Sequence, residues 1–165
     1  MILAAGFGTR LRPLTNTIPK PLLPVAGRPL IVWNLLLLKQ HGITEAIINL
    51  HHLGHLIEQE LGDGSALGMR LTYSRETVIL GTGGGIKEAE AFFENQPVVV
   101  MNADTLLDVD LTEVIRLHEV HDPVATMVVR ADAEAEAWGP VELDAMQQVI
   151  RINRTGRVGV KAAAL

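Results

Sequence analysis

The chain has 165 residues, a length that suits one domain with a single substantial hydrophobic core. It contains no cysteine, which excludes a disulfide framework and a thiolate metal site, and its net charge of −5 argues against a nucleic-acid partner. No apolar run approaches the roughly 20 residues that cross a bilayer, and the first residues lack the pattern of a signal peptide, so we expect a cytoplasmic protein without a membrane partner.

The charge is distributed unevenly along the chain. Residues 1–44 hold five Lys or Arg residues and no Asp or Glu, whereas residues 45–165 hold all 19 acidic residues and nine basic ones. A cationic segment in an acidic body concentrates positive potential locally. This distribution favours a small polyphosphate substrate over a polynucleotide.

The first predicted element is a short apolar strand, Met1–Ala5, which ends at a glycine-opened loop. Gly6 and Gly8 lack a Cβ where the backbone must turn tightly or let a ligand approach closely. Successive backbone N–H groups in such a turn form a concave anion site. Arg10 and Lys20 add cations, and the prolines around them stop the segment from forming a helix and stiffen it. The stretch therefore predicts a phosphate-binding loop.

Two better-known glycine motifs do not fit the sequence. The first loop has Leu11 where the dinucleotide fingerprint needs a third Gly or Ala, and no acidic residue precedes Glu45 to bind a ribose. The stretch Gly81–Lys87 resembles a P-loop, yet Ile86 and Glu88 occupy the places of Gly and Ser/Thr. NAD binding and P-loop hydrolysis are therefore minor alternatives.

Helical and strand patterns alternate through the rest of the first half. Pro29 stands at a plausible first helical position, and Gly42 is a good C-terminal glycine for the helix that follows. Strand–helix–strand order predicts a parallel sheet with right-handed crossovers. The predicted elements are a helix over 30–41, a strand over 46–50, a helix over 53–61 and a strand over 70–74.

The second half predicts further elements of the same sheet. Residues 97–101 are the most apolar strand, and we expect it to be central, with Asp104 at its carboxyl end, where ligands gather in open α/β sheets. The first loop and Asp104 should meet there if the strands at 1–5 and 97–101 are neighbours. The remaining predicted elements are a loop over 76–85, a helix over 85–93, a helix over 110–121 and a strand over 124–129.

Three motifs in order resemble the sugar-1-phosphate nucleotidyltransferases. They are Gly6-x-Gly8-Thr9-Arg10-Leu11-x-Pro13-Leu14-Thr15 with Pro19-Lys20-Pro21, then Leu80-Gly81-Thr82-Gly83-Gly84, then Asn102-Ala103-Asp104. The sequence looks closest to mannose-1-phosphate guanylyltransferases and N-acetylmuramate-1-phosphate uridylyltransferases. The resemblance implies an α/β fold, a three-layer Rossmann-like domain of the nucleotide-diphospho-sugar transferase type with a mainly parallel sheet and helices on both faces.

The resemblance also implies an activity and a site. A sugar 1-phosphate would attack an NTP, GTP or UTP, to give an NDP-sugar and pyrophosphate with the help of Mg²⁺, and self-association into a homo-oligomer stays open. Arg10 and Lys20 would be catalytic, and Asp104 would bind the metal. The remaining expected positions are Leu3, Ala4, Ala5, Gly6, Gly8, Thr9, Gly81, Thr82, Gly83 and Asn102 for the nucleotide, with Gly139 and Glu142 on the sugar side. The stretch from Trp138 to Asp144 resembles the family's strand beside the sugar, and residues 149–152 would pair with it as a hairpin.

Some residues keep two interpretations. Arg12 and Arg28 are each as readily solvated arginines as phosphate ligands. Glu76 could accept a hydrogen bond from a base N–H, but an exposed loop carboxylate is the simpler account. His51-His52-x-x-His55 resembles a metal cluster only superficially, since no cysteine supports it and its geometry at a strand end is undefined.

The last part of the chain departs from the family pattern. Asn153-Arg154-Thr155 stands where many relatives have Glu-Lys-Pro, and the sequence stops where the family domain continues. We therefore expect one catalytic domain over 1–165, truncated at its C-terminal end, without the part that supplies a second metal-binding aspartate. The alternative is a non-catalytic, nucleotide-binding regulatory domain of the same fold.

Overall fold

The computed structural model describes residues 1–153 and 155–156, apart from the side chains of Trp138 and Thr155. Tertiary contacts divide the chain into two compact units, Met1–Thr112 and Glu113–Leu165. The expectation of one domain over 1–165 stays a prediction.

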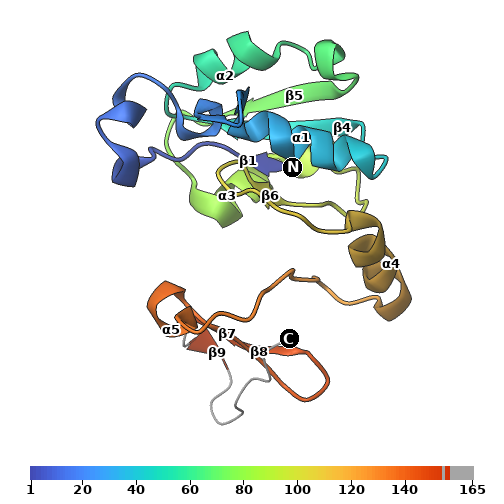
Figure 1. Ribbon diagram of the computed structural model, residues 1–165. Helices are drawn as coiled ribbons and strands as arrows, with labels where there is room; N and C mark the ends of the chain where they lie inside the picture. Colours follow the sequence, from blue (N-terminus) through green and yellow to red (C-terminus); the bar gives the residue numbers. More distant parts are fainter. Residues whose placement is uncertain (154, 157–165) are drawn as a thin grey trace. The chain divides into compact units, whose positions relative to one another are not determined.

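A four-stranded parallel sheet forms the centre of the first unit (Figure 1). Its strands are β1 (Ile2–Leu3), β4 (Glu45–Leu50), β5 (Arg70–Arg75) and β6 (Met101–Asn102), in the order β5-β4-β1-β6. All three strand pairs are parallel, which confirms the predicted sheet type. Because β1 lies directly beside β6, the segments that follow these two strands leave the sheet at the same edge.

Side chains alternate between two hydrophobic clusters on opposite faces of this sheet. Ile48 on β4 packs in the larger cluster with Leu35 of α1 and Ile57 of α2, whereas the neighbouring Ile47 packs in a smaller cluster with Ala89, just after α3. Helices therefore cover both faces, which gives the three layers expected for an α/β fold. The helices concerned are α1 (Leu30–Gln40), α2 (Gly54–Leu61) and α3 (Gly81–Glu88).

Helix α1 ends as the sequence predicts. Gly42 has a φ of +81° and donates its N–H to the carbonyl of Lys39, so the glycine closes the last turn in a left-handed conformation. Pro29 lies immediately before the first helical residue rather than within the helix. Between α2 and β5, the Tyr73 hydroxyl donates to the carbonyl of Gly62 at 2.6 Å, and burial raises the pKa of Tyr73 to about 12.

Shorter elements connect and follow the strands and helices of the sheet. Three 3-10 turns occupy the proline-rich first loop, and a small antiparallel sheet with the strand order β7-β8-β9 lies in the second unit. The elements are η1 (Thr9–Leu11), η2 (Leu14–Asn16), η3 (Lys20–Leu22), β2 (Pro24–Val25), β3 (Arg28–Pro29), η4 (Ser65–Leu67), η5 (Glu90–Phe92), α4 (Leu111–His121), α5 (Ala135–Trp138), β7 (Val141–Leu143), β8 (Val149–Ile152) and β9 (Thr155–Gly156).

The glycine-rich segment before residue 85 differs from the sequence prediction. We expected a loop over 76–85, but α3 begins at Gly81 and runs through the glycines. Glycine disfavours helix on propensity alone, which is why the sequence predicts a loop. The structure instead shows a packing reason for one of these glycines, because a Cβ on Gly85 would lie 2.7 Å from Asn49 Nδ2 and 2.8 Å from Glu76 Oε1.

Two strand predictions in the second half are wrong. The strand at 97–101 is reduced to β6, which stands at the end of the described strand order rather than at its centre. Residues 124–129 form neither strand nor helix and are exposed. Apolar, β-branched composition indicates only that a segment fits a half-buried sheet surface, and a strand still needs a neighbour to pair with. Val98 and Val100 keep 40% and 38% of their surface exposed, and no described strand pairs with β6 on that side.

Within the described residues, no helix is both long enough and apolar enough to cross a membrane.

Candidate functional site

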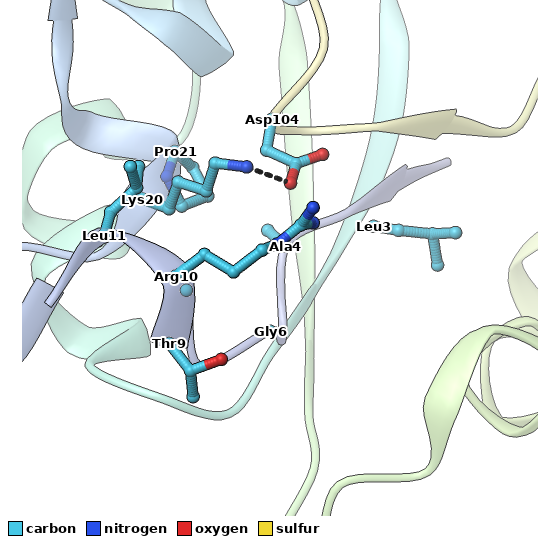
Figure 2. A pocket seen from close by; sticks show the side chains of 10 residues that line it. Leu3, Ala4, Gly6, Thr9, Arg10, Leu11, Lys20, Pro21 and Asp104 are labelled. Carbon is cyan, nitrogen blue, oxygen red and sulfur yellow. Dashed lines mark hydrogen bonds and ion pairs between the residues drawn. The ribbon is translucent and has the colours of Figure 1, made fainter. Parts of the chain in front are cut away.

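A pocket of about 240 Å³ lies at the carboxyl ends of β1 and β6 (Figure 2). The pocket is lined by residues of β1 and the first loop and by Asp104, which follows β6. Segments about 90 residues apart in sequence therefore meet at this pocket. The lining residues are Leu3, Ala4, Gly6, Gly8, Thr9, Arg10, Leu11, Lys20, Pro21 and Asp104. The structure thus brings together the cationic loop and Asp104, as the strand order predicts.

Lys20 and Asp104 form the central ion pair of the pocket. Lys20 Nζ donates to Asp104 Oδ2 at 2.6 Å, and the two side chains keep 24% and 39% of their surface exposed. Both groups are therefore reachable from solvent, and each satisfies the other's charge in the absence of a ligand. A phosphate or a metal ion that enters the pocket would compete for these same two groups.

Arg10 carries the other cation of the pocket. In Figure 2 its side chain points to the same side of the pocket as that of Lys20, where Asp104 lies. No described carboxylate is paired with Arg10, in contrast to the other pocket cation. The Arg10 guanidinium therefore faces the cavity without an ion-pair partner in the described part of the chain. A guanidinium has five N–H donors and can bind two phosphate oxygens at once.

The loop takes its shape from Gly8 and Thr15. Gly8 has a φ of +62°, and a Cβ at this position would lie 2.9 Å from Thr15 Cγ2 and 3.2 Å from Lys20 Cβ. The buried Thr15 donates its hydroxyl to the Gly8 carbonyl at 2.9 Å, which fixes the turn from inside. Gly8 is therefore required both for the backbone turn and for the close position of Lys20.

Gly6 has a different environment. It lines the pocket with a backbone that does not need a positive φ, and a Cβ there would meet no atom within 4 Å. The place that a side chain would take is therefore open space. This arrangement allows a ligand to approach the backbone closely.

Five of the expected nucleotide positions lie outside the pocket lining. Ala5 is buried, and Asn102 pairs with Leu3 in the sheet while its carbonyl accepts a hydrogen bond from Asn34 Nδ2 at 3.2 Å. Gly81, Thr82 and Gly83 form the exposed first turn of α3.

The two expected sugar-side positions, Gly139 and Glu142, belong to the second unit. Gly139 precedes the hairpin with a φ of +96°, close to Asn153. Glu142 forms an ion pair with Arg151 across β7 and β8, with Arg151 Nε donating to Glu142 Oε1 at 2.6 Å. Within the described chain this carboxylate is thus engaged in holding the hairpin together. Arg154 and the side chain of Trp138 lie outside the described residues.

The sequence interpretation misses a buried polar pair beside the pocket, Asn49 and Glu76. Glu76 is only 7% exposed, so the expectation of an exposed loop carboxylate is wrong. Its oxygens accept from Asn49 Nδ2 at 2.7 Å and from the Leu80 N–H at 2.9 Å. One signal was available: Asn49 is the polar residue in the otherwise apolar strand stretch at 46–50, and a buried polar side chain requires a partner.

The other ambiguous cations and histidines also have defined places. Arg12 is exposed and does not line the pocket, and the Arg28 guanidinium lies over the Trp33 ring, 5.3 Å from its centroid.

His51 Nδ1 lies 2.9 Å from the carbonyl of Glu76, and His52 Nε2 lies 2.9 Å from the carbonyl of Thr15. In the part of the chain that the structure describes, no three His, Asp or Glu side chains gather as a metal-binding group.

The sequence matches the model of one protein family, described as "Nucleotidyl transferase", over residues 1–153. The chain belongs to this family. One curated relative is N-acetylmuramate alpha-1-phosphate uridylyltransferase from Neisseria meningitidis, which is 56% identical to this chain over 113 residues. The matched stretch covers 68% of this chain and 49% of the relative. Mannose-1-phosphate guanylyltransferase from Mycobacterium tuberculosis is 36% identical over 91% of this chain and 42% of its own length.

Solved structures show the same fold. A putative glucose-1-phosphate thymidylyltransferase from Bacillus anthracis, in complex with a sucrose, matches with a TM-score of 0.83 and 28% identity over 92% of this chain and 61% of that one. A UDP-glucose pyrophosphorylase complexed with UDP-glucose matches with a TM-score of 0.63, covering 73% of this chain and 52% of its own. The nucleotidyltransferase-family chain thus spans less than two thirds of these proteins, and about half or less of the two curated relatives.

Proposed function

We propose that the chain provides the nucleotide-binding half of a sugar-1-phosphate nucleotidyltransferase. The observation that carries this proposal is the convergence of Arg10, Lys20 and Asp104 on one pocket at the carboxyl ends of β1 and β6. Two cations and a backbone-lined loop suit the triphosphate of an NTP, and the curated relatives point to UTP or GTP as the first nucleotides to test.

The proposed reaction needs no nucleophile from the protein. A phosphate oxygen of the sugar 1-phosphate attacks the α-phosphorus of the NTP, a new P–O bond forms, and the bond to the β-phosphate breaks to release pyrophosphate. Arg10 and Lys20 orient the phosphate groups and neutralise the charge that builds up on the departing pyrophosphate. Catalysis then consists of positioning and electrostatic stabilisation.

Asp104 fits the role of a Mg²⁺ ligand in this scheme. Magnesium uses few protein carboxylates and completes its coordination with water and phosphate oxygens, so one exposed carboxylate in the pocket is a suitable donor set. The ion would supply neutralisation of phosphate charge. Lys20 contacts only Oδ2 of Asp104, so Oδ1 can serve the ion, and incoming phosphate oxygens offer the ammonium group of Lys20 further acceptors.

Pyrophosphate release tests the proposal. The natural full-length polypeptide is assayed with each NTP against a panel of sugar 1-phosphates, with and without Mg²⁺. We expect turnover that depends on Mg²⁺, and a ranking of kcat/KM identifies the base and the sugar. If NTP binds but no pair turns over, the regulatory-domain alternative is correct; if no NTP binds, the site has been assigned wrongly.

A further inference from the structure

Asn49 and Glu76 are the centre of a buried hydrogen-bond bridge next to the pocket. Asn49, at 3% exposure, lies near the end of β4, and Glu76, at 7%, directly follows β5. Asn49 Nδ2 donates to Glu76 Oε1 at 2.7 Å. Neither residue lines the pocket, and the proposed chemistry leaves both without a role.

The bridge joins two segments that are far apart in sequence. At one end, Ala4, which does line the pocket, donates its backbone N–H to Asn49 Oδ1 at 2.7 Å. At the other end, the N–H of Leu80, which immediately precedes α3, donates to Glu76 Oε2 at 2.9 Å. The bridge therefore links the origin of the phosphate-binding loop to the start of the Gly81 helix.

The direction of each hydrogen bond is determined by chemistry. A backbone N–H can only donate, so the Asn49 oxygen must face Ala4 and its NH₂ group must face the carboxylate of Glu76. Gly85 packs directly against the pair, and a Cβ on this residue would clash with both side chains. Because the groups are buried, the loss of one partner leaves an unsatisfied donor or acceptor.

We propose that Asn49 and Glu76 are positioning residues that hold Ala4 and the start of α3 in the arrangement that binds the nucleotide. This inference rests on the proposed function, since it assumes that the pocket beside Ala4 takes the NTP. The pair acts through the backbone groups that it fixes. A competing role is direct contact between Glu76 and the base, which the experiment below separates from positioning.

The test exchanges the chemical roles of the two side chains. Asn49→Ala and Glu76→Ala each break the bridge, and we expect each to weaken Mg²⁺–NTP binding by about 10- to 100-fold, the equivalent of one unsatisfied buried partner. The double variant Asn49→Asp/Glu76→Gln keeps the total charge and all three hydrogen bonds. The new carboxylate at position 49 accepts from the Ala4 N–H and from the new amide at position 76. The oxygen of that amide accepts from the Leu80 N–H. We expect it to restore affinity to within a few-fold of the unsubstituted chain.

Calorimetric titration with UTP and GTP gives the affinities, and Ile57→Val is the matched control. Ile57 is fully buried in the larger cluster, so its truncation lowers stability without touching the bridge. Nucleotide affinity should stay unchanged in this control. An exchanged variant that binds as weakly as the single variants overturns the proposal, and one that binds well but reverses the preference between UTP and GTP assigns Glu76 to the base instead.

Amide hydrogen exchange without nucleotide separates this inference from the proposed function. Breaking the bridge should raise the exchange rate of the Ala4 and Leu80 amides together, and the exchanged variant should return both to their original protection. If the unsubstituted chain binds no NTP, the proposed function fails while this readout still decides whether the bridge holds the two segments. Unchanged exchange at either amide overturns it.

Discussion

Arg10 is the residue on which the proposed chemistry depends most directly. It faces the pocket without a carboxylate partner among the described residues, whereas Lys20 is already paired with Asp104. A phosphate can therefore bind Arg10 without first breaking an ion pair within the described protein. The charge of Lys20, by contrast, is already compensated by Asp104.

Substitution of Arg10 by alanine should lower the rate of pyrophosphate release by about 10²–10³-fold, the typical effect of losing one preorganised donor to the transition state. Arg12→Ala is the matched control, because Arg12 is a neighbouring exposed arginine outside the pocket lining. The control should change kcat/KM by no more than about fivefold, as expected for a screened surface charge. Equal losses in both variants would mean that general positive charge, rather than the Arg10 position, drives binding.

At the scale of the element, the first loop has two glycines with separable roles. Gly8→Ala forces a side chain into a backbone with φ of +62° and against Thr15, so we expect a loss of about 1–3 kcal/mol in the free energy of unfolding. Gly6→Ala meets no atom within 4 Å, so its stability should stay within about 0.5 kcal/mol of the original.

Urea unfolding and nucleotide titration of both variants check this prediction. Gly6→Ala should weaken NTP binding despite its unchanged stability, because the new methyl group occupies the open space where the ligand approaches the backbone. If Gly6→Ala binds NTP normally, the nucleotide does not contact this part of the loop.

At the scale of the whole molecule, the pocket lies entirely within the first unit. Every lining residue falls between Leu3 and Asp104, whereas the two expected sugar-side positions belong to the second unit. The 165-residue chain should therefore bind Mg²⁺–NTP more tightly than it binds a sugar 1-phosphate alone.

Thermal unfolding with each ligand separately tests this order of affinities. A concentration of NTP about 100-fold above its Kd should stabilise the chain by about 2.7 kcal/mol, and the same concentration of sugar 1-phosphate should have a smaller effect. Tight binding of a sugar 1-phosphate without nucleotide would show that the acceptor site lies in the pocket we assign to the NTP.

The sequence by itself determined the features that depend on neighbouring residues. The glycines and prolines of the first loop act within one continuous segment, so their spacing was enough to predict a tight loop after a strand, whose phosphate binding stays a prediction. The same holds for α1 and its terminal Gly42, and the alternation of helices and strands was enough for the parallel sheet.

Only the tertiary structure decided the features that depend on partners distant in sequence. Lys20 and Asp104 meet across 84 positions because β1 and β6 are neighbours, and Asn49 reaches both Ala4 and Glu76 for a similar reason. Local propensity also failed where such contacts compete with it: α3 starts at Gly81 against the preference of glycine, while residues 124–129 form no strand despite their composition. A buried polar group or a strand is stable only with its partner in place, and the chain alone does not name that partner.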